Sequence, residues 1–253
     1  MTKRFIALFD LHWGYQRSGG HKTPLHDPRA ISVALQFAKD FKPDVVILGG
    51  DALDCAMISH HTRGKPGQNE GLRLLSDAKG LQTEVIDPLT KLGSEHVYIV
   101  GNHEAWIDQL VDEHPGLEGV LALDRILDLS KWKVIPQGRY YRLGKLNFAH
   151  GDQFKGGEHV AKAAVIAAGK SIRFGHYHSY QVYTQTTMVD DHSRNGIQVP
   201  CLCRKDPAYG KKAPNKWQQG FNFGYVRADG TFSDYVALIT EGRATIHGKD
   251  YRG

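Results

Sequence analysis

Aspartate, asparagine and histidine follow five short apolar segments of this 253-residue chain, each at the point where the apolar run stops. The five junctions read Asp10-Leu11-His12, Gly49-Gly50-Asp51-Ala52-Leu53-Asp54, Gly101-Asn102-His103-Glu104, His150-Gly151-Asp152 and Gly175-His176-Tyr177-His178. Such runs are typical of buried strands whose carboxyl ends deliver polar side chains into a crevice. Because groups at the carboxyl edge of a sheet converge on one site, core packing alone does not explain the repetition. Carboxylate, amide and imidazole ligands suit Mn, Fe or Zn, and so many imidazoles argue against Ca and Mg.

Taken in order, the motifs D-x-H, G-D-x-x-D, G-N-H-E, H-G-D and G-H-x-H resemble the calcineurin-like metallophosphoesterase superfamily. The resemblance spans Asp10 to His178, about two thirds of the chain. It implies an α/β fold, a four-layer α/β/β/α sandwich of two mixed β-sheets flanked by helices. It also implies two divalent metal ions, with manganese expected first and iron or zinc as alternatives.

The resemblance places Asp51 between the two metals as a bridging carboxylate. The other ligands that it implies are Asp10, His12 and His178 for one metal and Asn102, His150 and His176 for the other. Two dications roughly 3.5 to 4 Å apart repel strongly, so an anionic group must lie between them. A metal-bound hydroxide, formed from water whose pKa the metals lower towards about 7, is the implied nucleophile.

His103 directly follows Asn102 and is the predicted general acid, because in similar enzymes the matching histidine protonates the leaving oxygen. Asp54 resembles the carboxylate that orients this histidine in phosphoprotein phosphatases. The alternative role for Asp54 is a helix cap just past the strand. Those phosphatases continue with Arg-Gly, where this chain has Cys55-Ala56, which disfavours a phosphoprotein substrate.

Basic residues gather with aromatic residues in the loops expected around the site. The candidate substrate-binding residues are Arg63, Lys211 and Lys212. Basic groups can follow a phosphate backbone while aromatic rings stack on bases, which suits single-stranded nucleic acid or nucleotides. The alternative is a solvated loop kept soluble by lysines. The net charge of +5 agrees with anionic partners but decides little by itself.

The remaining elements follow from periodicity and from turn residues. Helices are expected over 28–40 with Asp27 as cap, 72–92 with a break at Gly80, 104–113, 118–128 and 157–168, and a loop over 55–69 should overhang the site. Further strands are expected over 132–135, 139–143, 145–149, 180–189, 196–203, 221–228, 232–239 and 243–247. No repeat or linker divides the chain, so residues 1–253 are expected to form a single metallophosphoesterase domain.

Cysteine usage and hydropathy bear on the compartment. Cys55, Cys201 and Cys203 include no C-x-x-C pair, which fits a reducing environment. The apolar run after Lys3-Arg4 is too short for a signal peptide, and no later run could span a bilayer. We therefore expect a cytoplasmic protein with no membrane partner.

Together these patterns predict a dinuclear metal-dependent phosphoesterase, a hydrolase that acts on ester bonds. The favoured version is a phosphodiesterase acting on nucleic acid or nucleotides, with a nuclease as the first activity to test. One alternative is a phosphomonoesterase or pyrophosphohydrolase acting on a small phosphorylated molecule. An alternative of another class is a non-catalytic metal-stabilised binding module.

Overall fold

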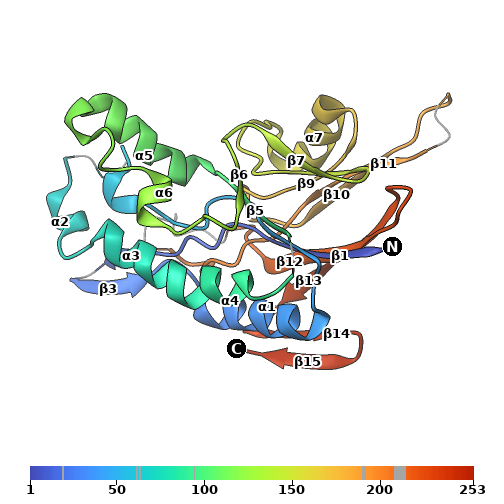
Figure 1. Cartoon of the computed structure of the whole chain (residues 1–253), viewed down its shortest axis with the longest axis horizontal. Coiled ribbons are helices and arrows are strands. Elements are labelled where there is room, and N and C mark those ends of the chain that lie inside the picture. Colours follow the sequence, from blue (N-terminus) through green and yellow to red (C-terminus); the bar gives the residue numbers. More distant parts are fainter. Residues whose placement is uncertain (19, 61, 63, 94, 190–191, 208–214) are drawn as a thin grey trace.

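The computed structural model describes residues 1–18, 20–60, 62, 64–93, 95–189, 192–207 and 215–253. Two mixed β-sheets lie face to face in it, and helices cover their outer faces (Figure 1). The predicted α/β/β/α sandwich is therefore confirmed.

The first sheet has six strands in the order β13-β12-β1-β4-β5-β6. Their bounds are β1 Lys3–Leu8, β4 Val45–Leu48, β5 Glu95–Ile99, β6 Lys133–Ile135, β12 Gln219–Val226 and β13 Phe232–Ile239. The strands from β1 to β6 in this order are parallel, whereas β12 runs antiparallel to both of its neighbours. Of the four parallel carboxyl ends that this sheet therefore presents, those of β1, β4 and β5 carry the polar junctions and lie side by side.

The second sheet has five strands in the order β10-β11-β9-β8-β7. Their bounds are β7 Tyr140–Leu143, β8 Leu146–Ala149, β9 Ser171–Phe174, β10 Gln181–Gln185 and β11 Arg194–Gln198. Strands β8, β9 and β11 are parallel, and β7 and β10 close the two edges in the antiparallel direction. The β10–β11 hairpin projects beyond the rest of the sandwich (Figure 1).

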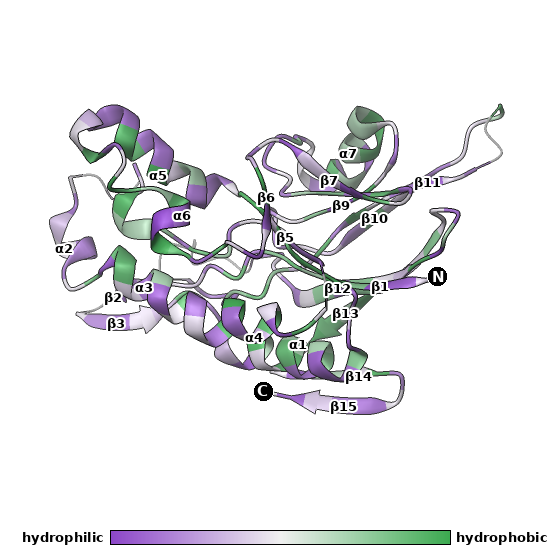
Figure 2. Ribbon diagram, viewed as in Figure 1, coloured by the Kyte–Doolittle hydropathy of each residue, from purple (hydrophilic) through white to green (hydrophobic). Residues whose placement is uncertain are grey.

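Alternation along the strands builds the layers. In β1, Phe5 and Ala7 belong to the apolar cluster between the two sheets, whereas Ile6 and Leu8 face the helices. On that outer side lie α1 (Pro28–Phe41), α3 (Leu74–Leu81) and α4 (Asp87–Thr90). On the far side of the second sheet, α7 (Val160–Ala168) packs through a third cluster. Figure 2 shows the apolar strands of the interior against the hydrophilic outer hairpin of β14 (Arg243–Ile246) and β15 (Lys249–Arg252).

The helix predicted over 28–40 is confirmed as α1, and Asp27 caps it by accepting hydrogen bonds from the backbone N–H groups of Arg29 and Ala30. The break predicted at Gly80 is wrong. Gly80 lies inside α3. A Cβ at this position would come within 2.7 Å of Trp13 Nε1, so the glycine makes room for the indole ring. The irregularity comes later, as a π-helical turn over Gln82–Ile86 that leads into α4.

Several predicted boundaries also shift. The segment 104–113 lies in α5 (Asn102–Glu113), whereas 118–128 keeps only the short α6 (Leu123–Ile126). The hairpin of β2 (Tyr15–Ser18) and β3 (His21–Pro24) was not predicted, nor was β15. These short surface strands lack the apolar runs that signal a buried strand.

Two features of the fold matter for the site. The carboxyl ends of β1, β4 and β5 lie together with those of β8 and β9, so the five polar junctions are brought to one edge of the sandwich. Among the described residues, no helix combines the length and the apolar character needed to cross a bilayer.

Candidate metal centre

The Asp51 carboxylate lies at the middle of a cluster of imidazoles. Its Oδ2 is 3.1 Å from His150 Nε2 and 3.9 Å from His12 Nε2. His103 Nε2 lies 3.8 Å from the same oxygen. One carboxylate oxygen is thus within reach of side chains from three different junctions, as a bridging ligand would have to be.

Asp10 forms a second focus beside the first. Its Oδ1 lies 3.6 Å from His178 Nε2, and that nitrogen is 3.1 Å from His12 Nε2. The other oxygen, Oδ2, accepts a hydrogen bond of 2.8 Å from the backbone N–H of His176. Two imidazole nitrogens and a carboxylate oxygen therefore face one another across a small gap.

Asn102 and His150 complete the other side. Asn102 Oδ1 is 3.0 Å from His150 Nε2, and His150 Nδ1 lies 3.1 Å from the Gly49 carbonyl. The His176 ring stands 5.2 Å from that of His150, and His150, His176 and Asp51 form a group whose ligand atoms lie within 4.8 Å of one another. The structure thus brings all seven predicted ligands into one pocket, and their role as ligands stays a prediction.

Backbone strain concentrates at these residues. Among the described residues, nine that are not glycine have positive φ, and five of them are predicted ligands: Asp10, His12, Asp51, His176 and His178. Their φ values lie between 47° and 71°, a region that costs such residues roughly 1 to 3 kcal/mol each. Strain of this kind persists only where the surrounding structure imposes it, and it clusters at functional sites.

Glycines in the motifs allow the carboxylates to approach. A Cβ on Gly101 would lie 2.1 Å from Asp51 Oδ1, and one on Gly175 would lie 2.3 Å from Asp10 Oδ2. With Gly101 bare, Asp51 Oδ1 accepts a hydrogen bond from the backbone N–H of His103, in the first turn of α5. Gly101 and Gly175 are therefore required for the close packing between motifs.

Glu104 holds the loop after β4 against the start of α5. Its carboxyl group accepts hydrogen bonds of 2.9 to 3.0 Å from the N–H groups of Asp51, Leu53 and Gly101 and from the hydroxyl of Tyr98. Because all four bonds lead to the framework, Glu104 positions Asp51 and Asn102.

The charges of the pocket are strongly coupled. Burial alone would raise the pKa of Asp51, but the imidazoles of His150 and His103 lower it well below its ordinary value. Burial opposes the charge on His150 and His103, but Asp51 raises the pKa of His150 to about 10 and that of His103 to about 9. The pKa of His176 is lowered, first by burial and then by His150. The carboxylates therefore stabilise positive charge on the imidazoles around them, and bound divalent cations could supply positive charge in the same place.

The donor set fits divalent metal ions. Asp10 Oδ1 is buried and has no hydrogen-bond partner among the described residues, which is costly for a carboxylate oxygen. It points to the gap that His12 and His178 also face. Oxygen and imidazole ligands of this kind suit Mn, Fe or Zn. The side chains present could therefore hold divalent metal between Asp10 and Asp51.

Asp54 lies beside His103, the histidine that it is predicted to orient, and also beside the predicted ligand His12. His12 Nδ1 donates to Asp54 Oδ1 at 2.7 Å, whereas His103 Nδ1 donates at 2.6 Å to the carbonyl of Asp54 and lies 3.3 Å from Oδ1. A cap role is not seen, because Cys55 is the residue that precedes the next helical turn. Asp54 thus orients a predicted ligand and the predicted acid together.

Three further side chains touch the centre without having been predicted. Trp106 lies against the His103 ring at 4.0 Å, and Trp217 meets the His178 ring edge-on at 4.2 Å. Cys203 Sγ lies 3.8 Å from His178 Nδ1. Trp106 could have been inferred, since it follows His103 by three residues on a helix and so shares its face. Trp217 belongs to the late segment of basic and aromatic residues, and Cys203 alternates with Cys201.

The predicted substrate-binding residues Arg63, Lys211 and Lys212 lie outside the described residues. His61, which belongs to the loop predicted over 55–69, does too. His60 is described, and its ring lies 6.0 Å from that of Trp106.

Comparison with known proteins gives distant likenesses. No family model matches the chain. The Gene 54 protein of Mycobacterium phage D29 is 24% identical over 266 residues, which cover 98% of each chain.

Solved structures with a similar fold include Vps29 of Chaetomium thermophilum, with a TM-score of 0.43 at 9% identity over 94% of this chain and 99% of that one. The phosphoesterase Yfce of E. coli gives 0.41 at 13% identity over 92% and 98%. A metallophosphoesterase of Sphaerobacter thermophilus gives 0.44 at 12% identity over 95% and 89%. Scores this low say nothing about the reaction, so the strand order and the convergence of the five junctions carry the assignment of the fold.

Proposed function

From the calcineurin-like metallophosphoesterase fold of this chain, we propose that the protein is a dinuclear metal-dependent phosphodiesterase that acts on nucleic acid or nucleotides. One observation carries the proposal: Asp51 lies within 4 Å of imidazoles from three junctions, and close by lies the buried Oδ1 of Asp10, which no described residue hydrogen-bonds. Asp51 would be shared by two metal ions, for which manganese is the first candidate and iron or zinc the alternatives. Bound there, the ions would neutralise charge on phosphate oxygens and lower the pKa of water.

The chain's own residues prepare the ligands. His12 donates from Nδ1 to Asp54, so its Nε2 is left to face the pocket. His150 donates from Nδ1 to the Gly49 carbonyl and likewise presents Nε2. Such partners fix the tautomer and the ring orientation and raise the basicity of an imidazole ligand.

His103 supports the leaving group. Its Nδ1–H is engaged by the Asp54 carbonyl, and although burial opposes charge on the ring, Asp51 and Asp54 raise its pKa to about 9. The side chain is 18% exposed, so Nε2 can be reached from solvent. A positioned acid of this kind contributes roughly 10²- to 10⁴-fold by protonating the departing oxygen.

The test compares three substrates after loading with manganese: a chromogenic phosphodiester, a chromogenic phosphomonoester and labelled single-stranded DNA. We expect the two diesters to be cleaved and the monoester to be a poor substrate. Dominant monoester turnover would identify a phosphomonoesterase, and no turnover with Mn, Fe or Zn would identify a binding module.

Asp51→Asn is the companion variant, because it keeps the volume of the side chain and removes its charge. Its metal content, measured after dialysis against trace manganese, should fall well below that of the parent. Parent-like metal content in this variant would contradict the bridging role.

A further inference from the structure

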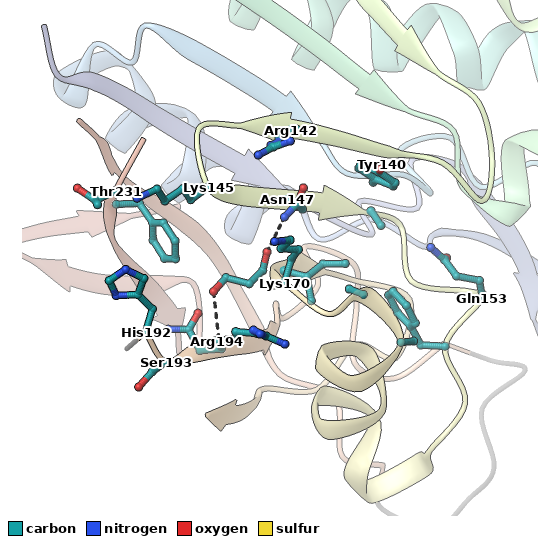
Figure 3. Close-up of a pocket in the computed structure, with 18 residues that line it drawn as sticks. Tyr140, Arg142, Lys145, Asn147, Gln153, Lys170, His192, Ser193, Arg194 and Thr231 are labelled. Atoms are coloured by element: carbon teal, nitrogen blue, oxygen red, sulfur yellow. Dashed lines mark hydrogen bonds between the residues drawn. The ribbon is translucent and has the colours of Figure 1, made fainter. Parts of the chain in front are cut away.

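A cationic groove runs along the outer face of the second sheet, beside α7 and away from the interior of the sandwich (Figure 3). It encloses about 1190 Å³. Among the described residues that line it are four cationic side chains and no carboxylate: Arg142, Lys145, Lys170 and Arg194. We call it the β8 groove, after the strand that forms its floor.

The groove exists because α7 covers only part of the sheet. This helix packs mainly on β9, β10 and β11 and reaches β8 only at Ala149, so Tyr140 and Arg142 on the outer face of β7 stay exposed. On β8, Leu146 and Phe148 point inward to the core between the sheets, so Asn147 and Ala149 point into the groove. A half-open sheet face carrying positive charge is available to a ligand.

Three of these cations carry no ion pair within the described part of the chain. Arg142, Lys145 and Lys170 are exposed, and none of them forms a salt bridge with another described residue. Asp229 lies near the Lys145 end, but its pKa is lowered mainly by hydrogen bonds from Thr231 and only weakly by Lys145. The charge of the groove is therefore not cancelled by its own walls.

Aromatic and amide groups accompany the charge. Tyr140 is 65% exposed at the rim. On the floor, Asn147 Nδ2 donates to the Ser171 carbonyl at 3.0 Å, and the backbone N–H of Asn195 donates to Ser171 Oγ at 3.1 Å. The Asn195 side-chain Oδ1 is buried and lacks a partner among the described residues. An exposed ring beside cations suits a base-bearing polyanion better than an acidic peptide.

One end of the groove adjoins the metal centre. Ala149 lines the groove, and the next residue is His150, whose Nε2 lies 3.1 Å from Asp51. Gln153 and Phe154 line the same end, and Tyr177, which sits between His176 and His178, donates from its hydroxyl to the carbonyl of Phe154. From Ala149 to Lys145 the floor extends about 13 Å along the strand, away from the centre.

We propose that the β8 groove binds the phosphodiester backbone of single-stranded nucleic acid whose scissile bond lies at the metal centre. Lys145, Lys170 and Arg142 contact successive phosphates, and Tyr140 stacks on a base. The position of the scissile bond rests on the proposed function, whereas binding of the strand in the groove does not depend on it.

The test measures binding of a fluorescein-labelled oligothymidylate by anisotropy in EDTA, where no cleavage occurs. The variant is Arg142→Ala/Lys145→Ala/Lys170→Ala. A matched control, Lys39→Ala/Lys79→Ala/Lys91→Ala, removes the same charge from exposed lysines on α1, on α3 and just after α4, in the opposite layer. The groove variant should bind at least about tenfold more weakly than the control, and its plot of log K against log salt should flatten by roughly 2, or about 0.7 per lost phosphate contact.

Tyr140→Ala supplies a second arm, with inorganic polyphosphate as the probe that has no bases. Weaker oligothymidylate binding with unchanged polyphosphate binding supports stacking. Equal oligothymidylate affinity in the groove variant and the control overturns the proposal. Polyglutamate serves as a third probe, and if the groove variant loses only polyglutamate binding, the proposal is also overturned and the partner is an acidic protein.

Turnover separates this proposal from the proposed function. With manganese, the groove variant should cleave the chromogenic phosphodiester at the parental rate while its KM for labelled DNA rises. If no form of the protein cleaves the chromogen, the proposed function fails, but the anisotropy in EDTA still decides whether the groove binds nucleic acid.

Discussion

Asp54 joins the predicted metal ligand His12 to the predicted acid His103: its Oδ1 lies 2.7 Å from His12 Nδ1 and 3.3 Å from His103 Nδ1. The carboxylate is 2% exposed, and although burial would raise its pKa, hydrogen bonds from His103 and His12 lower it. One buried charge therefore orients two imidazoles with different tasks.

The variant Asp54→Asn should lose metal affinity as well as turnover. An amide in place of the carboxylate no longer favours one tautomer of His12, and loss of such a partner typically costs 10- to 100-fold in affinity or activity. Calorimetric titration with manganese measures the first effect and hydrolysis of the chromogenic diester the second. Unchanged metal affinity would show that Asp54 acts on His103 alone.

The variant His103→Ala should keep its metal and lose turnover by roughly 10²- to 10⁴-fold on substrates with poor leaving groups. Diesters with strongly acidic leaving groups need no proton, so their loss should be much smaller. The measurement is the slope of log kcat against leaving-group pKa, which should be steeper for the variant. Parallel slopes would contradict the role of His103 as acid.

Glu104→Ala tests the framework beneath the centre. Its carboxyl group accepts four hydrogen bonds in a buried environment, so truncation leaves several unpaired donors, each costing roughly 1 to 3 kcal/mol. We expect the free energy of unfolding, measured in urea, to fall by at least about 3 kcal/mol. Asp112→Ala, on the exposed side of the same helix, serves as the control and should change it by less than about 0.5 kcal/mol.

Asp77 should make stability depend on pH. It is 2% exposed in α3, and burial raises its pKa from 3.8 to about 6, against an opposing effect of Lys22. Because the folded-state pKa is raised, the neutral form is favoured, and the free energy of unfolding falls as pH rises from 3.8 through about 6.

The variant Asp77→Asn should not show this fall in the free energy of unfolding, because an amide does not ionise. The variant should match the parent near pH 4 and exceed it in stability by up to roughly 3 kcal/mol above pH 6.5. Urea unfolding at several pH values gives the difference, and Glu84→Gln, exposed in the following turn, is the control. A difference that does not vary between pH 4.5 and 7 would contradict the prediction.

Local patterns were enough to predict that the five junctions converge, whereas the four layers and the ligand set followed from the resemblance of the motifs to a known superfamily. Each junction couples an apolar strand to polar residues at its end, and parallel strands bring their carboxyl ends together, so Asp10, Asp51, His150 and His176 could be assigned to one pocket before any coordinates. The helix over 28–40 followed from its apolar face and from Asp27, because capping is decided by neighbours in sequence.

Contacts between distant segments were decided only by the tertiary structure. Three features depend on how separate segments pack. They are the contacts of Asp54 with both His12 and His103, the packing of Gly80 against Trp13, and the β8 groove. The groove arises because α7 spans fewer strands than the sheet contains, and no local pattern of residues encodes that. Sequence periodicity reports which face of an element is buried, whereas the partner that buries it, or leaves it open, is a property of the assembled layers.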